Sequence, residues 1–449
     1  MQEFDLVVVG SGSGLDVASG LTARGRDVAV IEPGRLGGTC LNRGCIPSKV
    51  LIHRADIVQE IKNSEEFGIN SRLEKVNFDD IISKVNSEVH GESDSIRESL
   101  EASENHTLFR QEAGFVDEKV LELSESGERI RGEKILVAAG SRPYIPDIED
   151  TEDCEFWTSR EALNPGRKPE SLIIVGGGYI ALEMAHFYDA MGTDITILER
   201  GELLLGREDR EISEKITETA SNRYDVHIDT SVTGIDDSGE NKKVDAGGKT
   251  YRADEVMFAT GRIPNSDRLD LEETGVETTE SGEIRTDGKM RTSVDDVYAL
   301  GDVADGPMLK HTANHEAEIV FKNILSGDEY EADYSGVPHA IFTSPQVAGV
   351  GKTEQQLEDS GQKYLSATYD YADTGMGQAL HEEDGFVKVL AGEDGEILGC
   401  HIVGPDASQL IHEALVAMQA GSGKVNDIKD TMHIHPALNE VMDRAFSQL

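Results

Sequence analysis

The stretch Asp5-Leu-Val-Val-Val-Gly10-Ser-Gly12-Ser-Gly14-Leu15 decides the fold of this chain. Its apolar run ends in glycine, which is typical of a buried parallel strand entering a tight turn. A helix should follow, and then a second strand at 28–31 that ends at Glu32. The glycines let the backbone approach a pyrophosphate at a helix N-terminus, and Glu32 can accept hydrogen bonds from ribose hydroxyls. The stretch therefore predicts a dinucleotide-binding βαβ unit, against the alternative of an ordinary glycine-rich turn.

Leu15 departs from the usual dinucleotide fingerprint, because it occupies the position of the third glycine. That glycine normally permits close packing of the helix against the strand. We therefore expect different local packing here, without loss of phosphate binding.

The same layout returns at Ser171-Leu-Ile-Ile-Val-Gly176-Gly-Gly178-Tyr-Ile-Ala181, with a second strand at 195–198. Ala181 takes the third position, and Glu199-Arg200 ends the strand. An acid there suits the free ribose of NAD, whereas an arginine suits the extra phosphate of NADP. Two such units predict two nucleotide-binding lobes, although a Rossmann-like lobe that binds no nucleotide is the alternative for the second.

The remaining segments predict how the lobes are connected. Residues 52–110 look helical and charged, and the acidic, turn-rich residues 146–153 suit a crossover between lobes. A second crossover is expected near 262–265. From about residue 337 the pattern changes to alternating strand-like segments, at 386–390 and 397–403, and then a helix around 408–420. We expect an α/β fold with two Rossmann-like nucleotide-binding domains and a C-terminal α+β domain.

The charge of the chain is extreme, with 86 acidic and 42 basic residues and a formal net charge of −44. Such a protein repels itself at low ionic strength, and a very salty cytoplasm would screen the repulsion. An acidic protein from an ordinary cell is the alternative. Nucleic acid and anionic membrane surfaces are unsuitable partners. No signal peptide or bilayer-spanning run is expected, so the sequence predicts a cytoplasmic protein.

The segment Gly37-Gly-Thr39-Cys40-Leu-Asn-Arg43-Gly-Cys45-Ile-Pro47-Ser-Lys49 holds two thiols separated by four residues. They can form a disulfide only if the backbone brings them together. The spacing fits a loop entering a helix, whose N-terminus lowers a thiol pKa from about 8.5 into the range of roughly 3.5–7.5. A metal site is the alternative, but no second cysteine pair or histidine pair completes a tetrahedral set, so we expect no metal. The segment predicts a catalytic disulfide.

Taken together, these motifs resemble the class I pyridine nucleotide–disulfide oxidoreductases over essentially the whole chain. Further segments resemble family markers in the same order: 135–143, 258–262, 297–303, 309–313 and 342–351. The resemblance implies an FAD-binding domain at 1–145 and 264–335, an NAD(P)-binding domain at 146–263, and a dimerisation domain at 336–449.

The resemblance also implies the residues that hold each cofactor. For FAD these are Gly10, Gly12, Gly14, Glu32, Thr39, Gly140, Asp302, His311, Thr312 and Ala313. For the nicotinamide nucleotide they are Gly176, Gly178, Ala181, Glu199, Arg200 and Gly261. Lys49 and Glu183 match the family's ion pair beside the flavin, against the alternative of two surface charges.

The segment His435-Pro-Ala-Leu-Asn-Glu440 resembles the family's C-terminal catalytic motif. A histidine can exchange protons with a thiol, and a carboxylate on its other nitrogen would fix its tautomer. A simple turn is the alternative. The resemblance implies that His435 reaches the cysteines of the partner subunit, and hence an obligate homodimer. We expect His433 to be structural.

By this resemblance the enzyme passes electrons from a reduced nicotinamide nucleotide through FAD to Cys45, after which Cys40 attacks a small disulfide. No C-terminal cysteine pair follows, so mercuric and large thioredoxin reductases are disfavoured. Leu15 and the segments 309–316 and 435–438 are most similar to mycothione reductase.

The acidic composition suggests a halophilic archaeon, whose own thiol is γ-glutamylcysteine. The sequence therefore favours reduction of bis-γ-glutamylcystine with NADPH, and Arg43 could contact an anionic substrate or be a solvated arginine. An NAD-dependent dihydrolipoyl dehydrogenase is the alternative. A flavoprotein whose disulfide only senses redox state is the alternative from a different class.

Overall fold

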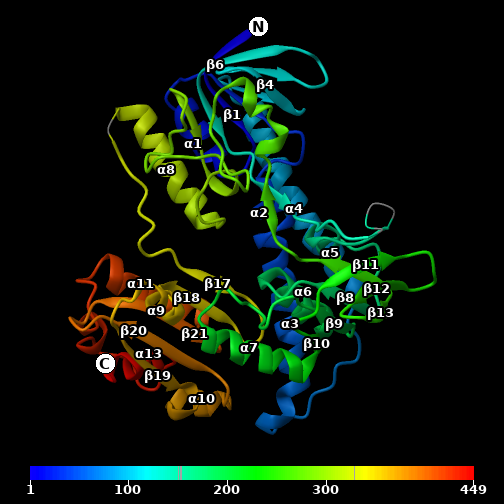
Figure 1. Ribbon diagram of the computed structural model, residues 1–449, viewed down its shortest axis with the longest axis vertical. Helices are drawn as coiled ribbons and strands as arrows, with labels where there is room; N and C mark the ends of the chain where they lie inside the picture. The colour runs from blue at the N-terminus through cyan, green and yellow to red at the C-terminus, as the bar shows by residue number, and fades with distance from the viewer. Residues whose placement is uncertain (150, 152–153, 328) are drawn as a thin grey trace. The chain divides into compact units, whose positions relative to one another are not determined.

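The computed structural model describes residues 1–149, 151, 154–327 and 329–449. The chain forms two compact units. Figure 1 shows the ribbon coloured by residue number. The first comprises Met1–Val50, Asp79–Tyr144 and Gly261–Asp333, and the second comprises Leu51–Phe78, Ile145–Thr260 and Tyr334–Leu449. Asp150, Glu152 and Asp153, within the expected first crossover, lie outside the described residues.

The first unit is built on a sheet of order β3-β2-β1-β6-β5-β4, with β16 added beside β6. Its strands are β1 (Gln2–Val9), β2 (Val28–Ile31), β3 (His106–Phe109), β4 (Ala113–Asp117), β5 (Val120–Leu123), β6 (Arg129–Val137) and β16 (Val297–Ala299). The strands β1, β2, β3, β6 and β16 are parallel. Helices α1 (Gly14–Thr22) and α8 (Lys310–Ser326) lie side by side on the sheet, where they bury a cluster of Val, Leu and Ile side chains (Figure 1). The expected first βαβ unit is confirmed.

The expectation of a helical segment over 52–110 is wrong at its C-terminal end. Helices α3 (Cys45–Asn63) and α4 (Phe78–Glu101) and the short 3-10 turn η1 (Ser64–Phe67) fill most of it, but His106–Phe109 form strand β3. This strand has only four residues and lies at the sheet edge, parallel to β2. Its Phe109 ring packs edge-on against Phe4 at 6.1 Å between centroids. Tertiary pairing with β2 therefore decides a segment too short to show a strand period.

The second unit contains a four-stranded parallel sheet of order β10-β9-β8-β14. Its elements are β8 (Ser171–Val175), α6 (Tyr179–Ala190), β9 (Asp194–Leu198), α7 (Arg210–Arg223), β10 (Asp225–His227) and β14 (Glu255–Phe258). A three-stranded antiparallel sheet accompanies it, formed by β11 (Val232–Asp236), β12 (Lys242–Ala246) and β13 (Lys249–Ala253). The expected second βαβ unit is confirmed.

The C-terminal part of the second unit is an antiparallel sheet of order β17-β18-β21-β20-β19 with helices around it. The strands are β17 (His339–Ile341), β18 (Val347–Gly351), β19 (Leu365–Asp370), β20 (Phe386–Ala391) and β21 (Ile397–Val403). The helices are α9 (Glu354–Ser360), α10 (Gly375–Leu380), α11 (Ala407–Gln419), α12 (Asn426–Lys429) and α13 (Glu440–Ser447). This is the α+β module that the sequence predicted.

Strand β20 corrects the expected alternation, because residues 387–391 are all buried. Val387 and Val389 belong to the core that α11 and α13 cover. On the other face Leu390 packs with Leu357 of α9, and Lys388 is held by side chains at the starts of α7 and α9. Both faces of the strand are therefore covered, which removes the alternation of apolar and exposed side chains.

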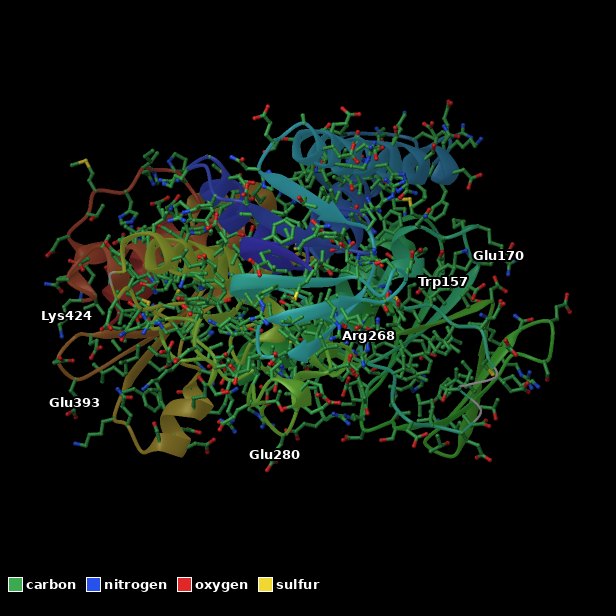
Figure 2. The ribbon with its side chains drawn as sticks, turned by 90° about the horizontal axis from the view of Figure 1, so that it is seen from above. Trp157, Glu170, Arg268, Glu280, Glu393 and Lys424 are labelled. Atoms are coloured by element: carbon green, nitrogen blue, oxygen red, sulfur yellow. The ribbon has the colours of Figure 1, made fainter. Side chains whose placement is uncertain are left out.

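A short strand just before the first expected crossover pairs with a short strand at the second expected crossover. Strand β7 (Ser141–Pro143) pairs antiparallel with β15 (Arg262–Pro264). Both belong to the first unit, so two segments about 120 residues apart in sequence meet there. Charged side chains cover the surface, and Glu170, Glu280 and Glu393 are exposed examples (Figure 2). Within the described part of the chain, every helix is too short or too polar to cross a bilayer.

Candidate active site

The turn between β1 and α1 leaves open space in front of its middle glycine. Gly10 has a φ of +105°, and a Cβ added to it would lie 2.2 Å from the carbonyl oxygen of Ala138. A Cβ added to Gly12 would meet nothing within 4 Å among the described residues. Because α1 begins at Gly14, its unpaired N–H groups face the turn. This arrangement fits a pyrophosphate at a helix N-terminus.

Close packing of helix against strand is shifted by one position from the expected glycine. A Cβ added to Gly14 would lie 2.8 Å from Cγ1 of Val8 and 2.9 Å from Cβ of Ala138. Leu15 is half-buried and packs against the core of the same unit. Gly14 therefore takes the packing role that Leu15 cannot, and the phosphate turn keeps its shape.

The two lobes hold a carboxylate in the same way at the end of their second strand. Glu32 accepts hydrogen bonds from the N–H groups of Ser11 (3.1 Å) and Gly34 (2.8 Å). Glu199 accepts from the N–H groups of Gly177 (2.5 Å) and Gly201 (2.6 Å). Each acid therefore spans the glycine turn and the residue after its own strand, which fixes it where an adenosine ribose binds.

In the second glycine turn, as in the first, the first glycine lies close to a backbone carbonyl group. Gly176 has a φ of +108°, and its added Cβ would lie 2.5 Å from the carbonyl oxygen of Ala259. Gly178 precedes α6 and has nothing within 4 Å among the described residues, whereas Ala181 is fully buried. Arg200, beside Glu199, is exposed.

Asp302 lies in a polar cluster with side chains from strands β7 and β15. Its Oδ2 accepts from the hydroxyl of Ser141 at 2.5 Å, and Nε of Arg262 donates to the same hydroxyl oxygen at 2.7 Å. Glu316, only 1% exposed, accepts from the N–H of Gly301 at 2.6 Å. Sequence reasoning named Asp302 but missed these three supporting side chains, since their partners are distant in sequence or belong to the backbone.

The start of α8 provides an unsatisfied buried group. Thr312 is 3% exposed, and its hydroxyl has no hydrogen-bond partner among the described residues. Such an orphan is costly unless a bound group satisfies it. Ala313 is buried and His311 is exposed, whereas His315 accepts from the N–H of Asp333 at 3.3 Å and so packs locally. Together with the glycine turn and Asp302, this part of the first unit fits FAD.

The backbone brings the two cysteines together beside the first glycine turn. Cys40 lies in α2 (Gly38–Arg43), and Cys45 begins α3. A Cβ added to Gly38 would lie 2.7 Å from Cα of Gly12, so α2 packs directly on the phosphate turn, and Thr39 is the next residue of α2. Both cysteines are thiols, with Cys40 half-buried and Cys45 exposed.

The Cys40 thiol holds its proton in the reduced pair. A hydrogen bond with Cys45, then burial, then the charge of Cys45 raise the pKa of Cys40, against a smaller lowering by Lys310. This is the opposite of the lowering expected from a helix N-terminus, because that helix starts at Cys45 and because one proton is shared within the pair. Cys40 therefore needs a base.

His435 and Glu440 form the pair that the C-terminal motif suggested. Nδ1 of His435 donates to Oε1 of Glu440 at 2.9 Å, and this hydrogen bond holds the pKa of Glu440 below its usual value. The His435 side chain is 77% exposed, whereas that of Glu440 is 12% exposed. The carboxylate fixes the tautomer, so Nε2 is the nitrogen that can exchange a proton with a reacting group.

The remaining residues that the sequence predicted for the site differ in burial and in backbone conformation. Glu183 is 3% exposed and accepts from the N–H of Phe342 at 3.1 Å. Lys49 belongs to the first unit and Glu183 to the second, so their pairing stays a prediction. Gly140 and Gly261 both have positive φ and open space at Cβ among the described residues. Arg43 has a buried Nε with no partner among those residues.

These features define a protein with two dinucleotide-binding lobes and a dithiol beside the first. The sequence pattern of the pyridine nucleotide-disulphide oxidoreductase family matches residues 4–317, and that of its dimerisation domain matches residues 337–446.

Two related enzymes and one solved structure are similar to this chain over nearly its whole length. Mycothione reductase of Mycobacterium tuberculosis is 35% identical over 457 residues and covers 99% of both chains. Dihydrolipoyl dehydrogenase of Haloferax volcanii is 35% identical over 463 residues, covering 99% of this chain and 96% of that protein. The copper(II) complex of the HOCl-induced flavoprotein disulfide reductase RclA from Escherichia coli superposes with a TM-score of 0.90, at 26% identity over the whole of both chains.

The chain belongs to the pyridine nucleotide-disulphide oxidoreductase family. It is accordingly an enzyme that uses FAD and a nicotinamide nucleotide, and it carries the family's dimerisation domain.

Proposed function

We propose that this enzyme reduces the disulfide of a small anionic thiol, bis-γ-glutamylcystine, with NADPH, in a salt-rich cytoplasm. The observation that carries the proposal is the Cys40–Cys45 dithiol, whose Cys40 lies on helix α2, which packs against the phosphate turn at Gly12. Bound FAD supplies the two electrons that convert the Cys40–Cys45 disulfide to this dithiol.

The dithiol then reduces the substrate in two exchange steps. His435 of the partner subunit takes the Cys40 proton, and the Cys40 sulfur attacks one substrate sulfur, so that a mixed disulfide forms and one thiolate leaves. The same histidine protonates that thiolate. Cys45 next gives its proton to the same histidine and attacks the Cys40 sulfur, which closes the Cys40–Cys45 disulfide and releases the second substrate thiolate, and the histidine protonates that thiolate. One dithiol and one substrate disulfide thus become one disulfide and two thiols.

Positive charge near the cysteines supports an anionic substrate. Arg43 lies within the redox segment and its Nε has no partner among the described residues. Lys310 is close enough to Cys40 to lower the pKa of that thiol. In a chain with a net charge of −44, a cation within the redox segment and a second cation near Cys40 are conspicuous. Guanidinium groups match carboxylates well, and bis-γ-glutamylcystine carries carboxylates, whereas lipoamide carries no charge.

The predicted nicotinamide-nucleotide site at the end of β9 favours a second candidate, an NAD-dependent dihydrolipoyl dehydrogenase. Glu199 is held as Glu32 is held, in a position that suits free ribose hydroxyls and disfavours a 2′-phosphate. The exposed Arg200 supports NADPH instead. The dihydrolipoyl dehydrogenase relative has the same identity, 35%, as the mycothione reductase relative.

An initial-rate comparison in molar KCl tests the proposal. We expect bis-γ-glutamylcystine with NADPH to be reduced faster than lipoamide with NADH. The reverse ranking would establish the second candidate. A Cys40→Ser variant should lose disulfide reduction and keep flavin reduction by the nicotinamide nucleotide. If that variant reduced disulfide normally, the cysteine pair would only sense redox state.

A further inference from the structure

The segment that carries His435 presents most of its side chains outward. Between α12 and α13, Met432 is 97% exposed and Ile434 is 77% exposed. The His435 side chain is also 77% exposed. The His433 side chain, by contrast, is only 9% exposed. The direction of His435 therefore depends on the few groups that hold this segment to the domain, and His433 is one of them.

His433 makes hydrogen bonds through both of its ring nitrogens. Nδ1 lies 3.0 Å from the carbonyl oxygen of Thr431, and Nε2 contacts a carboxylate oxygen of Glu413 on α11. A carbonyl oxygen and a carboxylate oxygen only accept, so both ring nitrogens must donate. His433 is therefore an imidazolium ion paired with Glu413.

The second oxygen of Glu413 holds the other end of the same segment. Oε2 accepts from Nδ2 of Asn439 at 2.8 Å, and Asn439 directly precedes Glu440 at the start of α13. One carboxylate on α11 thus contacts both sides of His435, two residues before it and four residues after it. We call Glu413, His433 and Asn439 the loop clamp.

The charges around His433 agree with its protonated state. Burial lowers the pKa of His433, but the hydrogen bond and charge of Glu413, the charge of Asp443 on α13 and the Thr431 carbonyl outweigh it, and the pKa is raised. Asp427 on α12 is engaged by the N–H and hydroxyl of Ser422 instead. The clamp is therefore complete below about pH 6.5, the ordinary pKa of histidine, and weakens as pH rises through the raised pKa.

We propose that Glu413 is a positioning residue for His435, acting through the His433 cation and Asn439. The inference rests on the proposed function, in which His435 of the partner subunit exchanges protons with the cysteine pair. The clamp touches no reacting atom. It fixes the direction of an exposed imidazole, and a displacement of about 1 Å can cost on the order of 100-fold in rate.

Two substitutions at Glu413 separate positioning from general stability. Glu413→Ala removes both bonds, so we expect the rate of disulfide reduction to fall by roughly 10- to 100-fold while flavin reduction by NADPH is unchanged. Glu413→Gln can still accept from Asn439 and can donate to neutral His433, so most of the rate should return. Glu393→Gln is the matched control, because Glu393 belongs to the same domain and its side chain is 69% exposed in a loose pair with Lys363.

The pH profile is the readout that a merely structural role would not move. In the wild type, disulfide reduction should decline as His433 loses its proton, and in Glu413→Gln this component should disappear because the amide pairs with neutral His433. Normal disulfide reduction in Glu413→Ala, or an equal loss of its flavin reduction, would overturn the proposal. If Glu413→Ala does not fold, an unchanged pH profile in Glu413→Gln overturns it. Failure of the proposed function is distinguishable, since it would appear as turnover by Cys40→Ser, or as faster reduction of lipoamide with NADH by the wild type.

Discussion

At the scale of single residues, Gly12 and Gly14 have different tasks in the first phosphate turn. Space is open at Gly12, whereas a methyl group at Gly14 would lie 2.8 Å from Val8 and 2.9 Å from Ala138. We expect Gly14→Ala to destabilise the apoprotein by about 1–3 kcal/mol, because overpacking forces the helix off the strand. Gly12→Ala should leave apoprotein stability unchanged and instead obstruct the pyrophosphate.

Urea unfolding of the apoproteins and titration with FAD measure the two effects, and each variant is the control for the other. The assignment would be wrong if Gly12→Ala bound FAD as the wild type does, or if Gly14→Ala were as stable as the wild type.

Ser141 provides a second residue-scale prediction. Its hydroxyl donates to Asp302 at 2.5 Å, and without it Asp302 would keep, among the described residues, the contact with Arg262 at 3.7 Å. A hydrogen bond to a charged group contributes roughly 1.5–3 kcal/mol. We therefore expect Ser141→Ala to weaken FAD binding by about 10-fold or more, measured by recovery of flavin fluorescence on dilution. Ser221→Ala is the control, because that exposed hydroxyl donates to the Thr217 carbonyl within its own helix, α7; equal loss in both would refute the role.

Residues near each other in sequence were predictable, and residues that meet only in the fold were not. Glu32 was identified because it ends a strand at a fixed distance from the glycine turn. Ser141 and Asp302 are separated by 161 positions, and no local pattern links them. The role of Glu413 was unpredictable for the same reason, since Glu413 is an ordinary acid on an amphipathic helix until His433 folds onto it.

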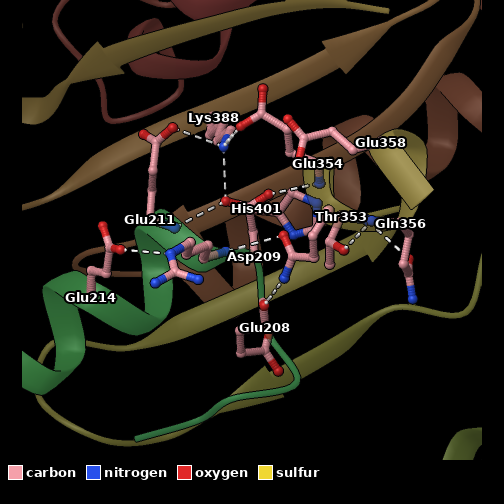
Figure 3. A network of polar contacts seen from close by, with 12 residues as sticks. Glu208, Asp209, Glu211, Glu214, Thr353, Glu354, Gln356, Glu358, Lys388 and His401 are labelled. Carbon is pink, nitrogen blue, oxygen red and sulfur yellow. Dashed lines mark hydrogen bonds and ion pairs between the residues drawn. The ribbon is translucent and has the colours of Figure 1, made fainter. Parts of the chain in front are cut away.

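At the scale of elements, a buried ion cluster ties α7 and α9 to strand β20 (Figure 3). Nζ of Lys388 contacts Asp209 (2.9 Å), Glu211 (2.8 Å) and Glu354 (2.6 Å), and both Lys388 and Asp209 are inaccessible to solvent. Asp209 also caps α7 and accepts from the N–H of Glu354 at 2.9 Å. One cation thus compensates three carboxylates contributed by two helix starts.

Lys388→Met should therefore leave those carboxylates uncompensated. Removing one partner of a buried pair costs about 3–5 kcal/mol, so we expect a loss of that order in the free energy of unfolding near neutral pH. Lys363→Met is the control, since its side chain is 80% exposed and its pair contributes at most about 1 kcal/mol. Denaturant unfolding of both variants measures the difference, and equal stability would show that β20 does not need the cation.

The same variant has a pH signature. Burial raises the pKa of Asp209, but the Glu354 N–H and Lys388 outweigh it, so the folded pKa lies below the usual 3.8. The stabilisation from Asp209 is therefore present above about pH 4 and is lost as pH falls through the depressed pKa. In Lys388→Met, protonation of the carboxylates relieves their repulsion, and the deficit in unfolding free energy should shrink in acid. A deficit that stayed constant with pH would point to lost packing alone.

This cluster also shows why elements were easier to predict than their environment. The location of β20 follows from its run of Phe and Val, but a lysine within the run reads as a solvent-facing residue. Its burial depends on α7, which begins 178 positions before Lys388 and brings Asp209 and Glu211 to the strand. For strand β3 the strand itself was unpredictable, because its four residues become a strand through pairing with β2.

At the scale of the whole molecule, the net charge of −44 governs stability through its surroundings. The acids are spread over the surface, as Glu170, Glu280 and Glu393 illustrate (Figure 2). Their mutual repulsion acts across about 10 Å at 0.1 M salt and across only about 3 Å at 1 M. We expect the melting temperature to rise steeply with KCl up to about 1 M and more slowly beyond it. Sucrose at matched osmolality, which screens no charge, should lack the steep component.

The dependence of the melting temperature on salt also distinguishes the surface repulsion from the contribution of the buried cluster at β20. Screening weakens interactions between exposed charges, whereas a pair from which solvent is excluded is screened much less. The melting temperature of wild type and Lys388→Met should therefore rise in parallel as KCl is added, with the gap between them kept. If KCl closed that gap, ions would reach Lys388 and the cluster could not be a dry junction. If KCl gave no rise beyond that in sucrose, the acidic surface would serve solubility rather than stability, and the proposed salt-rich setting would lose its physical support.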